Sequence, residues 1–354
     1  RVPFVMNLKI EPITLGLKTP FRIAHGISGV RRNVLVHICD GEHEGIGEAA
    51  PVRQHHETQD LVLDYLATIG EQWPPTCDPF QLEDTLAALP AGSQAARAAL
   101  DIALHDLIGR KLGVPLYRLF GLNPERAPLT SLTIGLGPVE EVQAKARAAA
   151  ANMPLLKLKF GHDTEHSLAL VRAVREATTV RLVADANCAW TQDQAQQIIP
   201  ALADLGLEWI EQPLPEGDLD GLHQLHRISP LPIFADEPVR TAHDIVRLAG
   251  LVDGVNIKIQ KAGGLREAIR MIAVARAHDL QVMLGCMVET SVGITAAAHL
   301  APLVDWADLD GTLLIRNDPF VGVHVDQGRL LLPDGPGLGV RPRTSEFMRR
   351  IVRS

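Results

Sequence analysis

The sequence predicts an α/β protein built as a parallel β/α barrel of the TIM type, preceded by a smaller α+β unit. Its 354 residues are enough for about two domains at the usual ~150 residues each. Hydrophobic residues make up 46% of the chain and charged residues 21%, which is typical of a globular protein. Beyond residue 128, short apolar runs recur at a nearly constant spacing. This regular spacing is the main indication of the barrel.

The first part of the chain is expected to form antiparallel strands and then helices. Apolar and polar residues alternate along residues 4–50, and Asp40-Gly41 is a common hairpin turn pair. Along residues 61–121 the pattern becomes helical, and residues 95–107 are rich in small, strongly helix-forming residues that allow close packing. Strands followed by separate helices predict an α+β unit.

Eight apolar runs in the second part of the chain are predicted to be the strands of the barrel. Their starts are separated by 23 to 27 residues, and most gaps hold a helical pattern, as in residues 193–205. The runs are apolar enough to be covered on both faces, which favours a closed parallel barrel over an open sheet. After residue 320 the pattern ends in a tail rich in Gly and Pro, which is expected to return to the first unit. The runs are residues 131–136, 155–160, 181–185, 208–211, 232–236, 255–259, 281–286 and 306–310.

Charged side chains end five consecutive runs. In a β/α barrel the active site lies at the carboxyl ends of the strands, so we expect these side chains to converge at one mouth. A carboxylate after a strand often caps the next helix instead, but Thr191 with Gln194 and Thr241 with Asp244 can form capping boxes for two of these helices. In strand order the charged residues are Lys157 and Lys159, Asp185, Glu211, Asp236 and Lys258.

The three acids, Asp185, Glu211 and Asp236, are predicted to bind one Mg²⁺. Crowded carboxylates repel one another and raise their own pKa values unless a cation lies among them. A set of oxygen ligands without His or Cys favours Mg²⁺ over Zn²⁺. The alternative is that each acid separately caps a helix or faces solvent.

The lysines at the strand ends are predicted to transfer protons. Lys157 and Lys159 share one face of their strand, which faces solvent in an edge strand but the interior mouth in a barrel. Lys258 approaches from the opposite side of the ring. A lysine can remove a proton α to a carboxylate if a divalent cation stabilises the resulting enediolate, and for this its pKa must fall below the usual ~10.4. Lysines on both faces, Lys159 and Lys258, would invert a stereocentre.

These residues resemble the enolase superfamily, in its muconate-lactonising subgroup, over essentially the whole chain. Each matching segment is short, and their order along the chain makes the resemblance specific. The segments are Gly45-Ile46-Gly47-Glu48-Ala49, Gly113-Val114-Pro115-Leu116-Tyr117, Lys157-Leu158-Lys159, Asp185-Ala186-Asn187, Glu211-Gln212-Pro213, Ala235-Asp236-Glu237, Asn256-Ile257-Lys258, Lys261-Ala262-Gly263-Gly264 and Gly335-Pro336-Gly337-Leu338-Gly339.

The resemblance implies a (β/α)₇β barrel with an α+β capping domain, whose loop near residues 20–30 closes the pocket. Residues 1–122 would form the capping domain, residues 123–319 the barrel, and residues 320–354 a tail returning to the capping domain. The resemblance also implies an isomerase with one Mg²⁺ per subunit, held by the three acids, and with Lys159 and Lys258 as the acid/base pair.

The last run ends in Asp308-Leu309-Asp310, which puts two carboxylates on one face. A simple turn at Asp310-Gly311 is the alternative. Two carboxylates suit an ammonium group and repel an acyl or carboxylate group. In dipeptide epimerases an Asp-x-Asp at this place holds the α-ammonium of the substrate, so the resemblance implies a dipeptide epimerase that inverts the C-terminal residue. It also implies that Thr133, Lys157 and Cys286, with the backbone at Met287, contact the substrate.

One departure from the family leaves the side-chain preference open. The Ala-Glu epimerases place an arginine in the capping loop to meet the glutamate side chain, and the matching residue here is Gly26. Four basic residues in or beside this loop could act instead or be ordinary surface charges. They are Arg22, His25, Arg31 and Arg32.

Two other functions fit the same residues. An N-acylamino acid racemase or o-succinylbenzoate synthase would use the same metal and lysines, and a barrel without catalytic activity could bind a small carboxylate through Mg²⁺. The formal net charge of −8 argues against nucleic-acid and anionic-membrane partners. The chain also carries neither a long apolar segment nor a secretory signal, so we expect a cytoplasmic protein. The family makes a homo-oligomer the expected assembly.

Overall fold

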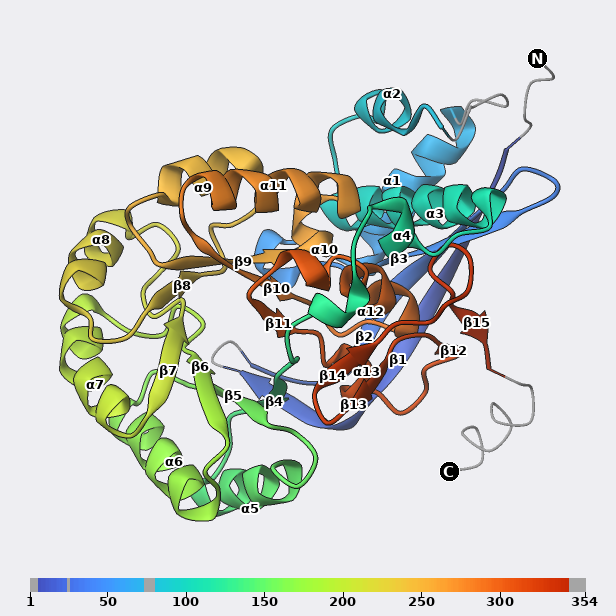
Figure 1. Cartoon of the computed structure of the whole chain (residues 1–354). Helices are drawn as coiled ribbons and strands as arrows, with labels where there is room; N and C mark the ends of the chain where they lie inside the picture. Colours follow the sequence, from blue (N-terminus) through green and yellow to red (C-terminus); the bar gives the residue numbers. More distant parts are fainter. Residues whose placement is uncertain (1–5, 24–25, 73–79, 344–354) are drawn as a thin grey trace.

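The computed structural model describes residues 6–23, 26–72 and 80–343, and these form a barrel with a smaller α+β unit against it (Figure 1). The smaller unit begins with three antiparallel strands in the order β1 (Asn7–Ile23), β2 (Gly26–Cys39) and β3 (Glu44–Ala49). The hairpin predicted at Asp40-Gly41 is confirmed, since Asp40 Oδ1 accepts hydrogen bonds from the backbone N–H groups of Glu42 and His43 and Gly41 has a φ of 93°. The helical elements that follow are η1 (Arg53–His55), α1 (Gln59–Gln72), α2 (Leu82–Ala87), α3 (Gln94–Leu112), α4 (Leu116–Leu119) and η2 (Pro124–Arg126).

Helix α3 packs closely on the sheet, as its small residues predicted. Gly45 and Gly47 of β3 face it, and a Cβ added to Gly47 would lie 1.9 Å from the backbone oxygen of Ala99. Residues 95–109 of the helix are buried except Arg97. The helix begins at the cap Ser93, whose side chain accepts a hydrogen bond from the backbone of Ala96, and it ends at Gly113, which has a φ of 69°.

The eight predicted barrel strands are all present in the described part of the chain, in one parallel sheet ordered as in the sequence. The first and last strands of this sheet meet at a parallel bridge between Thr130 and Ala307, which closes the barrel. The strands are β4 (Leu132–Ile134), β5 (Leu155–Lys159), β6 (Arg181–Asp185), β7 (Leu207–Glu211), β8 (Ile233–Ala235), β9 (Gly254–Lys258), β10 (Gln281–Gly285) and β11 (Trp306–Asp308).

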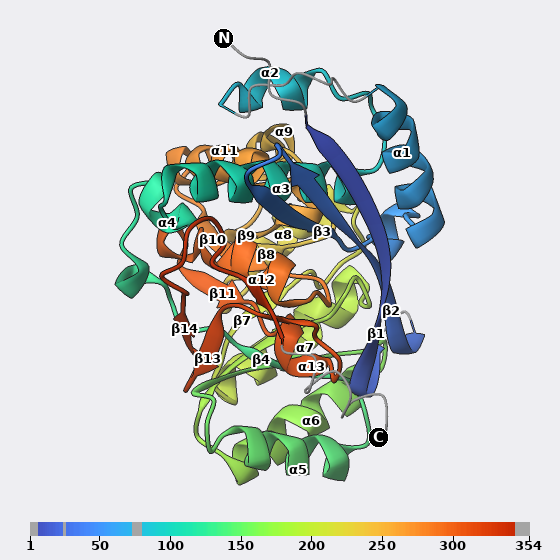
Figure 2. The same cartoon turned by 90° about the vertical axis from the view of Figure 1, so that its right-hand side faces the viewer.

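Helices follow the first seven barrel strands and cover the outside of the barrel, as Figures 1 and 2 show. Only the single turn α13 (Gly311–Leu314) directly follows β11 among the described residues, which agrees with the (β/α)₇β arrangement. Thr191 and Gln194 form the predicted capping box of α7. The helices are α5 (Val139–Ala149), α6 (Thr164–Ala177), α7 (Gln192–Asp204), α8 (Leu219–Ile228), α9 (Ala242–Leu248), α10 (Ile259–Ala262), α11 (Leu265–Ala277), α12 (Ser291–Ala298) and η3 (Ala301–Leu303).

An apolar plug fills the barrel interior beneath the charged mouth. Val183, Trp209 and Phe234 belong to one buried cluster, in which the rings of Trp209 and Phe234 lie 4.7 Å apart. Each of these residues stands two positions before one of the three acids. Because side chains alternate along a strand, the same face supplies the plug and then, one step nearer the mouth, a carboxylate.

The tail packs against the smaller unit at the end of α3. Gly337 exchanges backbone hydrogen bonds with Val114 and Leu116, and the backbone N–H of Leu338 donates to Asp106 Oδ1 at 2.7 Å. The tail contains β12 (Phe320–Val321), β13 (His324–Asp326), β14 (Arg329–Leu331) and β15 (Arg341–Pro342). None of the described helices has the length and apolar character needed to cross a lipid bilayer.

Candidate active site

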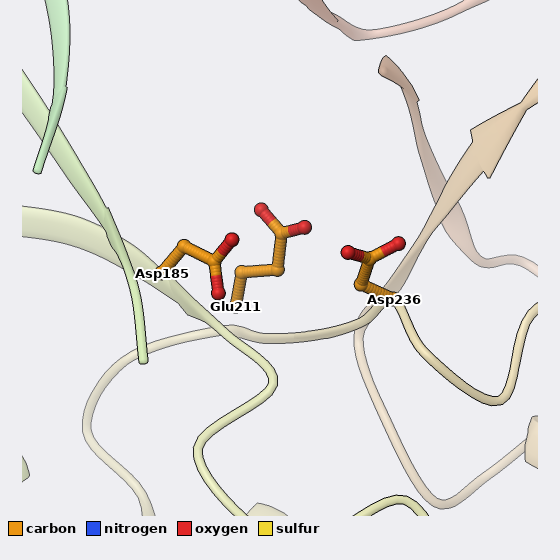
Figure 3. Close-up of side chains that lie close together, drawn as sticks. All are labelled: Asp185, Glu211 and Asp236. Carbon is orange, nitrogen blue, oxygen red and sulfur yellow. The ribbon is translucent and has the colours of Figure 1, made fainter. Parts of the chain in front are cut away.

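Three buried carboxylates meet at the carboxyl ends of neighbouring barrel strands. Asp185 ends β6, Glu211 ends β7, and Asp236 directly follows β8. One oxygen from each lies within 4.8 Å of the others, and the side chains face one another in Figure 3. Asp185 and Glu211 have no exposed surface, and Asp236 is 3% exposed. The structure thus brings together the three acids that the strand spacing predicted to converge.

The lysines contact these acids from both sides. Lys159 Nζ lies 2.5 Å from Asp185 Oδ2, and Lys258 Nζ lies 2.7 Å from Asp236 Oδ2. Lys157 lies between Glu211, at 2.5 Å, and Asp308, at 2.7 Å. The proposed acid/base pair therefore flanks the two outer acids, with Glu211 between them.

Two opposing effects set the pKa values of these acids: burial raises them, and the positive charges of the lysines lower them. Burial raises the pKa of Glu211 to about 7, with a further contribution from the charge of Asp185. Burial also acts to raise the pKa of Asp236, but the charges of Lys258 and Lys261 outweigh it and hold that pKa well below its usual value. Lys261 donates to Asp236 Oδ1 at 2.6 Å, a contact that the pattern of strand ends did not predict.

Proton transfer by Lys258 needs a lowered pKa, and the acids around this lysine act in the opposite direction. Burial lowers the pKa of Lys258, but Asp236 and Glu211 raise it above its ordinary value. The same balance raises the pKa of Lys157, which is buried beside Asp308, Glu211 and Asp185. The physical reason is that the lysines are here the counterions of the acids. A lower pKa of Lys258 requires another cation to neutralise the acids in place of the lysines.

The three acids fit a hard divalent cation. They offer only carboxylate oxygens within 4.8 Å of one another, which suits Mg²⁺ better than Zn²⁺. The raised pKa of Glu211 indicates that its negative charge is incompletely compensated in the buried site, and a dication would supply the compensation.

Two further carboxylates, Asp308 and Asp310, stand beside Thr133 of β4. Asp308 Oδ1 accepts hydrogen bonds from Ser131 Oγ at 2.6 Å and Thr133 Oγ1 at 3.3 Å, and Asp310 Oδ2 accepts from the backbone N–H of Thr133 at 2.6 Å. Burial acts to raise the pKa of Asp308, but Lys157 and Lys159 lower it to about 2. Burial and the charge of Asp308 raise the pKa of Asp310 to about 6. Asp310 precedes α13 but its side chain makes no cap hydrogen bond there, so the contacts of its carboxylate differ from those of a simple helix cap.

A cavity of about 540 Å³ joins these groups. Its floor contains Lys159, Asp236 and Lys258, whereas Asp185 and Glu211 are buried and do not line it. Strand β2 of the smaller unit contributes to its wall, so both units form the cavity. The other predicted substrate contacts also line it, namely Thr133, Lys157, Cys286, Met287, Asp308 and Asp310.

The region near residues 20–30 is largely a pair of strands rather than a loop. Gly26 begins β2, and His25 lies outside the described residues. Arg32 is exposed and does not line the cavity, whereas Arg31 does.

Amide side chains hold the acids, a role that the pattern of strand ends did not predict. Asp185 accepts hydrogen bonds from the backbone and the side chain of Asn187, at 2.8 and 3.1 Å. Asn256 Nδ2 donates to Glu211 Oε1 at 2.7 Å. Asn187 and Gln212 have positive φ angles of 45° and 38°, so the chain bends sharply just after two of the acids. The sequence contained a signal for them, since Asn187, Gln212 and Asn256 lie in the segments that match the enolase superfamily.

The smaller unit also fixes a loop of the barrel through Glu48. The buried carboxylate of Glu48 accepts hydrogen bonds from Thr290 Oγ1 at 2.6 Å and from the backbone N–H of Gly293 at 3.0 Å, at the start of α12. Asn33 of β2 donates to Glu48 at 2.8 Å and to the backbone oxygen of Val288 at 3.0 Å. These bonds hold the end of the segment after β10 that lines the cavity.

Known proteins share both parts of this structure. Residues 7–121 match the mandelate racemase / muconate lactonizing enzyme N-terminal domain, and residues 141–346 match the enolase C-terminal domain-like family. The chain is 41% identical to an L-Ala-D/L-Glu epimerase of Bacteroides thetaiotaomicron, over 95% of this chain and 88% of that protein. It is 38% identical to a hydrophobic dipeptide epimerase of Roseobacter litoralis, over 94% of this chain and 98% of that protein.

The solved structures agree with these relatives. A dipeptide epimerase from Enterococcus faecalis, complexed with Mg and the dipeptide L-Leu-L-Tyr, matches with a TM-score of 0.91 and 34% identity, over 95% of this chain and 99% of that chain. The fold, the cluster of acids at the barrel mouth and these relatives lead to one assignment. The chain belongs to the enolase superfamily, in its mandelate racemase and muconate lactonizing enzyme group, and to the isomerases within it.

Proposed function

We propose that the chain is a Mg²⁺-dependent dipeptide epimerase that inverts the α-carbon of the C-terminal residue through an enediolate. The observation that carries this proposal is one cavity with Lys159 and Lys258 at opposite ends of the acid cluster and with Asp308 and Asp310 in its wall. The similarity to proteins named dipeptide epimerases, one of them solved with Mg and a dipeptide, supports it.

The metal site consists of Asp185, Glu211 and Asp236, which would hold one Mg²⁺ per subunit. When bound, the cation supplies positive charge that stabilises the negative charge developing on the carboxylate of the substrate. The cation would then replace the lysines as the counterion of the acids, so that one lysine can be neutral and act as a base.

The two lysines divide the proton transfer. Nζ of one lysine takes the α-proton from one face of the substrate, so that a C–H bond breaks and an N–H bond forms as the enediolate develops. Nζ of the other lysine then donates a proton to the opposite face, which forms the new C–H bond. The reaction in the reverse direction restores both lysines, as does proton exchange with solvent.

The free amino end of the dipeptide is assigned to Asp308 and Asp310, because two carboxylates suit an ammonium group. Lys157 is buried between Glu211 and Asp308, and its positive charge suits the substrate carboxylate. Thr133 and Cys286 line the same cavity and would contact the rest of the substrate.

Hydrogen exchange tests the proposal. The protein is incubated in D₂O with Mg²⁺ and a panel of L,L-dipeptides, and mass spectrometry measures α-deuterium. We expect one deuterium in some dipeptides and a mixture of L,L and L,D products. The absence of incorporation into every dipeptide would overturn the proposal and leave a barrel that only binds carboxylates.

Two variants separate the dipeptide epimerase from an N-acylamino acid racemase or an o-succinylbenzoate synthase. Asp308→Asn and Asp310→Asn should lower kcat/KM for free dipeptides by about 10- to 100-fold, since each removes a charged partner of the ammonium. The exposed Asp326→Asn makes the same change far from the cavity and serves as the control. Unchanged activity in both site variants, with faster turnover of N-acyl substrates, would favour the rival enzymes. The homo-oligomer, the cytoplasmic location and the domain boundaries stay predictions.

A further inference from the structure

We propose that Gln260 is a positioning residue for the base Lys258, because its buried amide fixes three segments of the cavity wall at once. This inference rests on the proposed function and adds a residue to it. Gln260 has no exposed surface and stands two residues after Lys258, in the single turn α10. It does not line the cavity, so it acts through its neighbours rather than on the substrate.

Both polar atoms of the Gln260 amide have partners, and these partners fix its orientation. Oε1 accepts a hydrogen bond from the backbone N–H of Ala50 at 2.9 Å. Nε2 donates to the backbone oxygen of Glu48 at 3.0 Å and to Glu289 Oε2 at 2.8 Å. A backbone N–H can only donate and a backbone oxygen can only accept, so a flipped amide would break the bonds to Ala50 and Glu48. A carboxylate or an apolar side chain at this position would not make the same three bonds.

The three bonds join segments that border the cavity. Ala50 lines the cavity directly, and it follows β3 of the smaller unit. Glu289 comes directly after residues 286–288, which also line the cavity, and Glu289 Oε1 accepts a hydrogen bond from the backbone N–H of Met287 at 2.8 Å. The third segment is the end of β9, which carries Lys258. One side chain therefore connects the base to the two parts of the wall beside it.

The backbone at Lys258 is paired with a neighbouring strand on one side. In the described chain β10 pairs with β9 as far as Lys258, whereas the pairing of β8 with β9 ends at Val255, three residues earlier. The backbone after Lys159 is held differently, because the N–H of Phe160 donates to the backbone oxygen of Asp185 at 2.9 Å. The position of Lys258 therefore depends on side-chain contacts of the turn that follows it, and that of Lys159 depends on the sheet.

The turn α10 needs contacts outside itself to be stable. It has four residues, and helices of this length are not stable on their own. Lys261 of the turn and Lys258 before it both contact Asp236, at 2.6 and 2.7 Å. In the proposed reaction Asp236 binds the cation, so these two contacts weaken. The bonds of Gln260 involve no metal ligand, and we expect them to persist when the cation binds.

Loss of the Gln260 amide would leave buried polar groups without their partner. The backbone N–H of Ala50, the backbone oxygen of Glu48 and the carboxyl group of Glu289 would each lose a hydrogen bond. Buried polar groups without a partner are unfavourable, so the segments would shift to reach water or another partner. Such a shift would displace Lys258 relative to the substrate.

Exchange of the α-proton in D₂O, measured for each epimer of a dipeptide, tests the inference. The variant Lys258→Ala identifies the epimer whose α-proton Lys258 removes, since that epimer no longer exchanges. Gln260→Met keeps the length of the side chain without the amide. It should slow exchange of the same epimer by about 10- to 100-fold, because a small misplacement of a base has a cost of this size. Exchange of the other epimer, through Lys159, should stay close to the wild-type rate, which also shows that the variant is folded.

Gln143→Met is the matched control. Gln143 Nε2 donates to the backbone oxygen of Ala173 at 2.9 Å, so it joins α5 to α6 through the same kind of bond outside the cavity. Both epimers should exchange at the wild-type rate in this variant.

A second measurement needs no turnover. Amide hydrogen exchange reports whether a backbone N–H keeps its hydrogen bond. In Gln260→Met the N–H of Ala50 should lose protection because its acceptor is gone, and the N–H of Met287 should lose protection because Glu289 is no longer held. The N–H of Phe160, which is bonded within the sheet, should keep its protection.

The possible results separate this inference from the proposed function. Equal slowing of both epimers in Gln260→Met, or exchange of both at the wild-type rate, would overturn the positioning role and leave the epimerase proposal intact. Unchanged protection of Ala50 and Met287 would also overturn it. A wild type that exchanges no dipeptide, together with the loss of protection at these two amides in the variant, would contradict the proposed function and support the role of Gln260 in fixing the wall.

Discussion

Lowering the pH should destabilise the fold through one buried histidine, His299. Its ring is fully buried at the end of α12 and lies between two other parts of the chain. His299 Nδ1 lies 3.2 Å from the backbone nitrogen of Tyr117, whose N–H can only donate, so Nδ1 must be unprotonated. Nε2 then carries the proton and donates to the backbone oxygen of Leu338 at 3.2 Å. A second proton on the ring would break the bond from Tyr117.

The size of the effect follows from the pKa of His299. Burial lowers this pKa to about 4, whereas the bond to Leu338 opposes the shift and an unfolded histidine has a pKa of ~6.5. Because the folded pKa is the lower one, the unfolded state binds more protons between these values. The stabilisation is complete above pH ~6.5 and is lost as the pH falls toward 4. Linkage then predicts a loss of about 2.5 kcal/mol between pH 7 and pH 4.5 from this residue.

Urea unfolding of the wild type and of His299→Gln at a series of pH values isolates this contribution. The other groups titrate alike in both proteins, so the difference between their unfolding free energies should shrink by about 2.5 kcal/mol from pH 7 to pH 4.5. The exposed His324→Gln serves as the control and should track the wild type. Parallel curves for the wild type and His299→Gln would refute the reasoning.

Three further changes test the fold, the metal site and the bases. Gly47→Ala should cost about 1 to 3 kcal/mol of unfolding free energy in urea, because its Cβ would lie 1.9 Å from a backbone oxygen of α3, whereas Gly29→Ala, with open space around it, should be nearly neutral. Millimolar Mg²⁺ should raise the Tm of the wild type, EDTA should reverse this, and Glu211→Gln should reduce the shift; an equal shift in that variant would contradict the metal site. Lys159→Ala and Lys258→Ala should each stop epimerisation while each still exchanges the α-proton of one epimer in D₂O, and epimerisation by either variant would exclude the two-base reaction.

The barrel and the charged residues at its mouth could be predicted from the sequence, because both recur at a regular interval along the chain. A parallel strand followed by a helix brings the chain back to the same end of the sheet about every 25 residues. Polar residues that recur on this period, such as Asp185 and Glu211, must therefore lie at one mouth. Alternation along each strand also decides their direction, since Trp209 and Glu211 share the face that points into the barrel.

The contacts that complete the site depend on packing between segments that are far apart in the sequence. A regular spacing along the chain does not predict such contacts. Glu48 and Thr290 are 242 residues apart, yet they join the smaller unit to the barrel. The pairing of Lys261 with Asp236 likewise depends on how the elements pack against one another. Charge balance is a property of the whole cavity, so the raised pKa of Lys258 became visible only with the acids around it in place.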